Sequence, residues 1–216
     1  MSKKEIVKNA IETSGGIIKT AELINAGITK TDIAELYSNF YIDKVKHGYY
    51  KLAKSNISEE QILSTLLTDG IVCVQSALFH YGYSDFAPRE WSIAVPRTVS
   101  RSKLKIEDIP IKAFYIKEEL FELGKTTDDF NVFTLNIYDR ERTICDCFKY
   151  KNQLNSEIFN KAINVYIADD NKNLANLSKY AKELKVYKKV TELMDVLLNG
   201  SQSLICSRKV KEQSKR

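Results

Sequence analysis

Residues that commonly bind metal ions are scarce in this sequence. It contains two histidines and four cysteines, and no two cysteines have the C-x-x-C spacing. Neither His47 nor His80 lies at ligand spacing from a cysteine, so the sequence indicates no metal site and no cofactor. We expect the cysteines to be reduced and mostly buried thiols: Cys73, Cys145, Cys147 and Cys206.

Long apolar runs are also absent. No stretch of about 18 apolar residues occurs, and the opening segment MSKKEIVKNAIE has charges among its apolar positions. We therefore expect no membrane span, no secretory signal and a cytoplasmic location. With 44% hydrophobic and 28% charged residues over 216 positions, the chain can fold as one large domain or two small ones.

Motifs that would identify an enzyme are missing. The Gly-Lys-Thr at residues 124–126 resembles part of a phosphate-binding loop, but Glu119 stands where that motif needs a glycine. Ser76, His80 and Asp85 lack the glycines of a nucleophile elbow. No enzymatic reaction is predicted.

Acidic residues elsewhere have ordinary structural explanations. The pairs at residues 128–129 and 169–170 are expected in solvated turns or as helix caps. Arg142 and Asp146 lie four residues apart on a predicted helix. A local ion pair worth roughly a few tenths of a kcal/mol accounts for them.

The first quarter of the chain predicts three helices followed by a hairpin. Helices are indicated at residues 3–14, after a cap at Thr20, and after a cap at Thr29 whose partner is Asp32. A hairpin pattern around His47-Gly48 follows. This order is that of a winged helix-turn-helix, whose second paired helix enters the DNA major groove while the hairpin contacts the backbone.

The distribution of charge favours a polyanionic partner. Positive charge is concentrated at both ends of the chain, and residues 58–138 carry an excess of acids. On the third helix Ile33, Leu36, Tyr37 and Phe40 are expected to share one face, opposite a polar face. The residues predicted to contact DNA are Lys19, Thr20, Thr29, Lys30, Thr31, Ala34, Ser38, Lys44, Lys46 and His47.

Within that set the expected roles differ. Lys30, Thr31 and Ala34 are assigned to base edges, with Ser38 further along the helix. Residues 44 and 46 are expected on one side of a strand, as a clamp on phosphate, with residue 45 facing the other way. His47 either reaches a groove or is a simple turn residue.

The remainder of the chain predicts a second, α+β domain. A capping box at Ser58 and Gln61 opens it, strand patterns follow between residues 71 and 135, and four amphipathic helices come after residue 139. We assign residues 1–56 to the DNA-binding domain, 57–200 to the second domain and 201–216 to a basic, mobile tail. A second basic surface could contact nucleic acid or be the wet side of packed helices: Lys179, Lys182, Lys185, Lys188 and Lys189.

Several segments in order resemble the AbiEi-type antitoxins of bacterial abortive-infection, type IV toxin–antitoxin systems. They are AELINAGITKTDIAELYSNFYIDKVKHGYYKL, IVCVQSALFHYGYSD, WSIAVPR, DRERTICDCF and LSKYAKELKVYKKVTELMDVLL. The resemblance implies an N-terminal winged helix-turn-helix that represses its own operon at inverted repeats. It also implies a C-terminal domain that opposes a nucleotidyltransferase-like toxin without a stable complex. Residues 39–40 depart from the family, where a glycine is common before the wing.

The leading hypothesis is therefore a non-enzymatic repressor and antitoxin, bound to double-stranded DNA as two cooperating copies of a chain that can be monomeric in solution. Three alternatives stay open. One is a winged-helix regulator whose second domain senses a ligand, another is a DNA-targeted nuclease, and the third is a winged helix that contacts protein alone.

Overall fold

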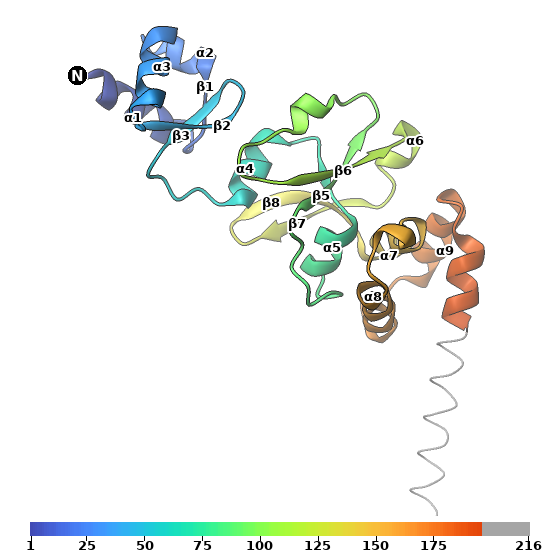
Figure 1. The fold of residues 1–216 in the computed structure, drawn as a ribbon. Coiled ribbons are helices and arrows are strands. Elements are labelled where there is room, and N and C mark those ends of the chain that lie inside the picture. The colour runs from blue at the N-terminus through green and yellow to red at the C-terminus, as the bar shows by residue number, and fades with distance from the viewer. Residues whose placement is uncertain (196–216) are drawn as a thin grey trace, which may run out of the picture.

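The computed structural model describes residues 1–195, and it is a mixed α+β structure (Figure 1). Two separate sheets are present in this part of the chain, one of three strands and one of five. A smaller N-terminal unit, residues 3–52, is joined by an extended segment to a larger unit that holds the second sheet and the later helices. The predicted tail at 201–216 lies outside the described residues.

The N-terminal unit contains the predicted helices and hairpin. Its elements are α1 (Lys3–Thr13), β1 (Ile18–Lys19), α2 (Thr20–Asn25), α3 (Lys30–Ser38), β2 (Ile42–Lys46) and β3 (Tyr49–Leu52). The strand order is β1-β3-β2, with both pairs antiparallel. Strand β1 has only two residues, too few for a periodic pattern, and was not predicted. The helices pack their apolar faces together around Val7, Ile11, Leu23, Ile33 and Ile42.

Left-handed residues end the first three helices. Gly15 and Gly27 have φ angles of 74° and 89°, as their positions after α1 and α2 predict. At the end of α3 the same position is taken by Phe40, with φ of 53°. The Tyr41 N–H donates to the Leu36 carbonyl at 2.9 Å, the bond that closes this type of helix end. A non-glycine residue in this conformation is strained.

The five-stranded sheet has the order β6-β5-β4-β8-β7, with parallel and antiparallel pairs. Its segment of chain runs through α4 (Glu59–Leu66), β4 (Ile71–Val72), α5 (Val74–His80), β5 (Trp91–Pro96), the 3-10 turn η1 (Arg101–Leu104), β6 (Ile111–Ile116), α6 (Glu118–Phe121), β7 (Lys125–Phe130) and β8 (Phe133–Tyr138). Strand β7 was missed because five of its six residues are polar and exposed. The prediction that Asp128 and Asp129 lie in a turn is therefore wrong, since both pair with β8 in an edge strand.

Helices after residue 139 form one apolar cluster beside this sheet. They are α7 (Arg140–Lys149), η2 (Lys151–Gln153), α8 (Ser156–Ala168) and α9 (Leu174–Glu183), followed by a helical segment from 187 through 195. The predicted stripes are buried here, with Ile144, Ala162, Leu177 and Val190 each under 7% exposed. The described cysteines Cys73, Cys145 and Cys147 are free and buried, as expected.

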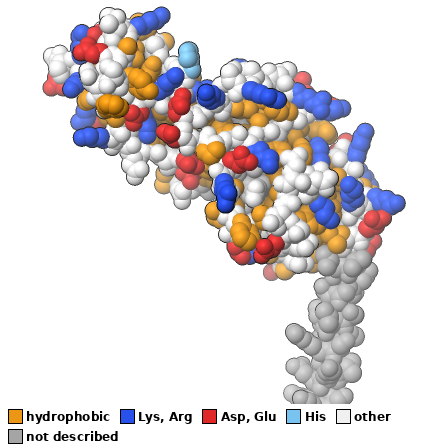
Figure 2. Space-filling model, viewed as in Figure 1, with side chains coloured by type: hydrophobic (Ala, Val, Ile, Leu, Met, Phe, Trp, Pro, Cys, Tyr) orange, Lys and Arg blue, Asp and Glu red, His pale blue; other side chains and the backbone are white. Residues whose placement is uncertain are grey.

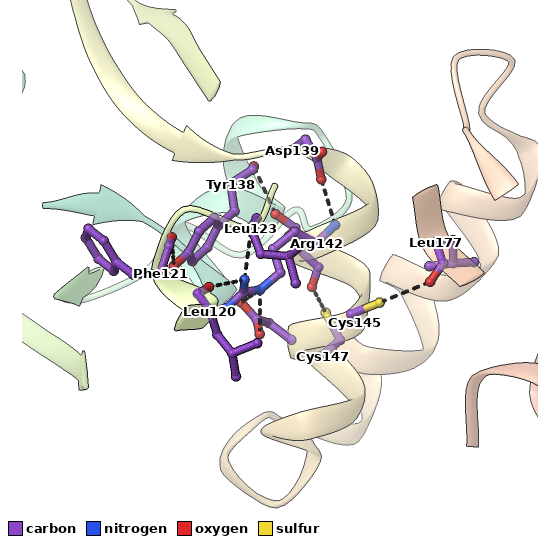
Figure 3. Close-up of polar contacts among 11 residues, drawn as sticks. Leu120, Phe121, Leu123, Tyr138, Asp139, Arg142, Cys145, Cys147 and Leu177 are labelled. Atoms are coloured by element: carbon purple, nitrogen blue, oxygen red, sulfur yellow. Dashed lines mark hydrogen bonds and ion pairs between the residues drawn. The ribbon is translucent and has the colours of Figure 1, made fainter. Parts of the chain in front are cut away.

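A buried arginine connects α7 to the sheet (Figure 3). Arg142 is fully buried, and its Nε lies 3.3 Å from both carboxylate oxygens of Asp146. Its Nη1 donates to the carbonyls of Leu120 and Leu123 at 2.9 and 2.8 Å, and its guanidinium lies over the ring of Tyr138. The expected weak local pair is thus part of a buried network, because the loop after α6 folds over this face of α7.

The two units touch through specific polar contacts. The Glu107 N–H donates to the Val45 carbonyl at 2.7 Å, so the loop between β5 and β6 is bonded to β2. Gln61 Nε2 donates to the Gly15 carbonyl at 2.7 Å. The capping box predicted at Ser58 is only half formed for this reason: Ser58 accepts from the Gln61 N–H, but the Gln61 side chain is used elsewhere.

Between residues 1 and 195, no helix is both long and apolar enough to cross a membrane. Over the same range, no group of three or more His, Cys, Asp or Glu side chains is arranged to hold a metal ion.

Candidate nucleic-acid interface

Helix α3 begins with the capping box that the sequence predicts. The Asp32 N–H donates to Thr29 Oγ1 at 3.1 Å, and the Asp32 carboxylate accepts from the Thr29 N–H at 3.0 Å. Lys3 from α1 lies 2.5 Å from the same carboxylate. The hydrogen bonds from Lys3 and Thr29 lower the pKa of Asp32 to about 2. The start of α3 is therefore fixed, and the Thr29 hydroxyl serves this cap.

The polar face of α3 is exposed as expected. Lys30, Thr31, Ala34 and Ser38 all lie on the surface, while Ile33 and Leu36 are buried. The prediction that Tyr37 and Phe40 share the buried face is wrong. Tyr37 is 50% exposed because it lies at the edge of the apolar stripe, and Phe40 is 81% exposed because it follows the helix in a left-handed conformation.

Near the start of α2 the structure corrects one detail. Lys19 occupies the N-cap position, and Thr20 is the first helical residue rather than the cap. Both the Thr20 N–H and its hydroxyl donate to the Gly48 carbonyl, at 2.8 and 3.2 Å. Lys19 lies with its ammonium 5.9 Å from the centre of the Tyr49 ring. These contacts join the start of α2 to the hairpin turn, so Thr20 has a structural role.

The hairpin forms as predicted, with His47 exposed at a turn whose Gly48 has φ of 80°. Val45 is buried, but the ladder is irregular between Lys44 and Lys46, which interrupts the alternation assumed from the sequence. Lys46 donates to the carbonyl of Lys103. Burial, and then the charge of Lys103, lower the pKa of Lys46. The expected matched clamp of two free lysines is therefore not what the structure contains, because Lys46 is held by the second unit.

This contact brings basic residues that the sequence analysis missed next to the hairpin. Arg101, Lys103 and Lys105 are exposed on η1 and the residue after it. Lys and Arg side chains gather along the edge of the larger unit where the loop between β5 and β6 lies (Figure 2). The cluster RSKLK could have been noticed as a basic run inside the acidic middle of the chain. Its place beside the hairpin depends on tertiary folding.

The second predicted basic surface is also exposed. Lys179 and Lys182 belong to α9, Lys185 follows it with φ of 60°, and Lys188 and Lys189 lie on the next helical segment. Lys188 lies 3.9 Å from Glu192, and Lys182 lies over the Tyr187 ring. Both contacts are on the surface. They are compatible with the solvent-exposed side of packed helices and equally with a surface that binds nucleic acid.

No catalytic triad is assembled from the residues considered above. Ser76 Oγ accepts from the Ser92 N–H at 2.9 Å, and Asp85 pairs with Lys161. His80 lies 2.9 Å from Asp128 instead. These three side chains serve three separate contacts.

Comparisons with known proteins bear on the fold alone. No known protein family matches the chain, and no curated protein does. Among solved structures, the chain is similar to the crystal structure of the Rv2827c protein from Mycobacterium tuberculosis, with a TM-score of 0.63 over 82% of this chain and 70% of that one. The two sequences are 14% identical. A similar α+β fold thus occurs in a second protein, although the two sequences share little identity.

Proposed function

We propose that this chain is a sequence-specific DNA-binding repressor whose N-terminal unit is a winged helix-turn-helix. The observation that carries the proposal is the arrangement of residues 3–52. Two helices, α2 and α3, are joined by a short turn and precede a hairpin. Strand β3 of this hairpin pairs with β1, the short strand that comes before α2. Helix α3, the second of the pair, exposes a polar face and is the element expected to enter the major groove.

The chemistry of the exposed residues fits this docking. Lys30 at the first turn of α3 can reach a base edge or phosphate, and Thr31 and Ser38 offer short polar side chains to the groove. Lys44 and His47 lie on the hairpin beside it. The loop between β5 and β6 extends the basic surface with Arg101, Lys103 and Lys105, so both units contribute cations to the DNA backbone.

Two further expectations complete the proposal. A unit of about 50 residues reads few bases, so two copies on an inverted repeat would supply the specificity. The sequence resemblance to AbiEi-type antitoxins suggests that the repeat lies in the promoter of the chain's own operon, and that the larger unit opposes a co-expressed nucleotidyltransferase-like toxin without binding it stably.

The test is a titration of the upstream DNA with the full chain at several salt concentrations. Lys30→Ala should weaken binding by about 1–3 kcal/mol at the specific site if this lysine contacts a base edge. Arg101→Ala/Lys103→Ala should weaken specific and non-specific DNA alike. This double change should also reduce the slope of log K against log salt by about 2, because each lost phosphate contact contributes about 0.9.

Lys8→Ala is the matched control. It removes one positive charge from the same unit, but from α1, where Lys8 is exposed and lies 3.8 Å from Glu12. Its affinity and salt slope should equal those of the unaltered chain. A salt slope near zero for the unaltered chain, or equal losses for Lys8→Ala and Lys30→Ala, would remove the DNA-binding proposal.

A further inference from the structure

A pocket of about 530 Å³ lies in the larger unit, and its lining includes none of the residues assigned to the proposed DNA surface. It is bounded by α4, the end of α5, the segment leading into β5, and the turn between β7 and β8. Its volume is in the range of small-molecule sites.

Aromatic rings form much of its wall. The rings of His80 and Phe130 are stacked, with centroids 4.0 Å apart and planes 24° apart. Trp91 lies 5.9 Å from Phe130, and Phe79 is 44% exposed beside them. The 2.9 Å contact of His80 with Asp128 holds the imidazole in this stack. Faces of aromatic rings carry negative charge density and attract cations.

Carboxylates add to this negative potential. Four acidic side chains line the pocket: Glu59, Glu60, Glu90 and Asp129. Among the described residues, its lining contains one Lys or Arg side chain, that of Arg89. Glu59 accepts from Trp91 Nε1 at 2.6 Å and Glu60 from Asn131 at 3.3 Å. These donors are neutral, so neither contact places a counter-charge beside the carboxylate. Glu90 differs from these two, because Lys112 Nζ lies 4.0 Å from its carboxylate and forms a surface ion pair with it.

We propose that this pocket binds a small organic cation that carries an aromatic or other apolar group. The rings of Trp91 and Phe130 would contact the apolar group of the ligand, and their faces would also attract its cationic group. Glu59 and Glu90 would balance the positive charge. An anion or a phosphate ester would meet repulsion from four carboxylates. A neutral aromatic molecule would gain only the contact with the rings.

The position of α4 gives such a ligand a route to the N-terminal unit. Glu59 and Glu60 face the pocket, while the neighbouring Gln61 donates to the Gly15 carbonyl. Ile57, just ahead of α4, packs near Gly16. A ligand that draws on Glu59 or Glu60 would therefore act on the helix that holds the end of α1. This regulatory step rests on the proposed DNA-binding function, whereas binding of the cation does not.

The test uses the fluorescence of Trp91, the single tryptophan of the chain. The full chain is titrated with benzyltrimethylammonium, with benzyl alcohol as an uncharged analogue and with benzoate as an anion. We expect a saturable change with the cation, binding at least tenfold weaker for benzyl alcohol, and no saturable change with benzoate. Equal affinity for the cation and the alcohol, or no saturation with the cation, would overturn the proposal without any variant.

Variants then test the assigned groups. Phe130→Leu keeps an apolar side chain but loses the ring, and Glu90→Gln loses the charge but keeps the shape. Each variant should bind the cation with an affinity lower by about threefold to thirtyfold. Glu118→Gln, an exposed carboxylate outside the pocket, should bind as the unaltered chain does. Unchanged affinity in both pocket variants would refute the site. DNA titrations with and without saturating cation test the regulatory step separately. If the cation binds in the fluorescence titration but leaves the DNA affinity unchanged, the regulatory step is excluded and the binding site is not.

Discussion

Replacing Arg142 by methionine removes a guanidinium that no water reaches. Its partner Asp146 is 1% exposed, and in the variant this carboxylate would be buried without a counter-charge. The carbonyls of Leu120 and Leu123 would also lose their donor. Breaking a buried ion pair from one side costs about 3–5 kcal/mol, and a lost bond to a buried carbonyl costs about 1 kcal/mol more. With two such carbonyls, we therefore expect Arg142→Met to lower the free energy of unfolding by about 5–7 kcal/mol.

A second change separates these contributions. Arg142→Met/Asp146→Leu removes the uncompensated carboxylate but leaves the two carbonyls without the guanidinium. Because apolar replacements of buried ion pairs are often close to neutral, the double variant should recover more than half of the loss. Recovery that is complete would show that the carbonyl bonds contribute little.

Urea unfolding followed by far-UV circular dichroism measures both variants, with Lys8→Met as the control. Lys8 and Glu12 have the same i,i+4 spacing as Arg142 and Asp146, but their side chains are 55% and 56% exposed at a distance of 3.8 Å. An exposed pair of this kind contributes roughly 0–1 kcal/mol. If Arg142→Met cost no more than Lys8→Met, the argument that burial decides the energy of the pair would be refuted.

Two other predictions concern the N-terminal unit. Phe40→Gly should raise the free energy of unfolding, measured by urea titration, by about 0.5–1 kcal/mol. The reason is that φ of 53° strains a non-glycine residue, while the ring, which is 81% exposed, makes little contact that could be lost. Asn39→Gly is the control, because Asn39 has φ of −87° and should give no such gain. Asp32 has a lowered pKa of about 2 against an ordinary 3.8, so its contribution to stability is complete above about pH 4 and is lost as the pH falls toward 2. Between these pH values Asp32→Asn should show a shallower fall in urea-unfolding free energy, and an equally steep fall would contradict the assignment.

Local signals in the sequence predicted most elements of the N-terminal unit. The cap at Thr29 and Asp32 and the left-handed Gly27 depend on residues within four positions of each other, and both are confirmed. Strand β7 was missed for the opposite reason. Its polar residues give no apolar alternation, and only pairing with β8 makes it a strand.

Contacts between distant segments were beyond sequence reasoning. Spacing alone predicted a weak local ion pair for Arg142 and Asp146, because nothing local shows that the loop after α6 will cover them. Lys103 of η1 lies 57 positions after Lys46, and their contact follows only from tertiary folding. The pocket around Trp91 likewise draws on segments from residue 59 to residue 131.

The anchoring of the hairpin changes what the proposed DNA surface consists of. Folding holds Lys46 against the carbonyl of Lys103, and the charge of Lys103 contributes to the lowered pKa of Lys46, so these two cations repel each other. A phosphate beside them would relieve this repulsion, which favours binding of an anion at the junction of the two units. Because the Glu107 N–H also fixes Val45 from the same loop, the hairpin has little freedom to lose on binding. The larger unit thereby acts, in the proposed function, as part of the DNA-binding surface as well as the carrier of the pocket.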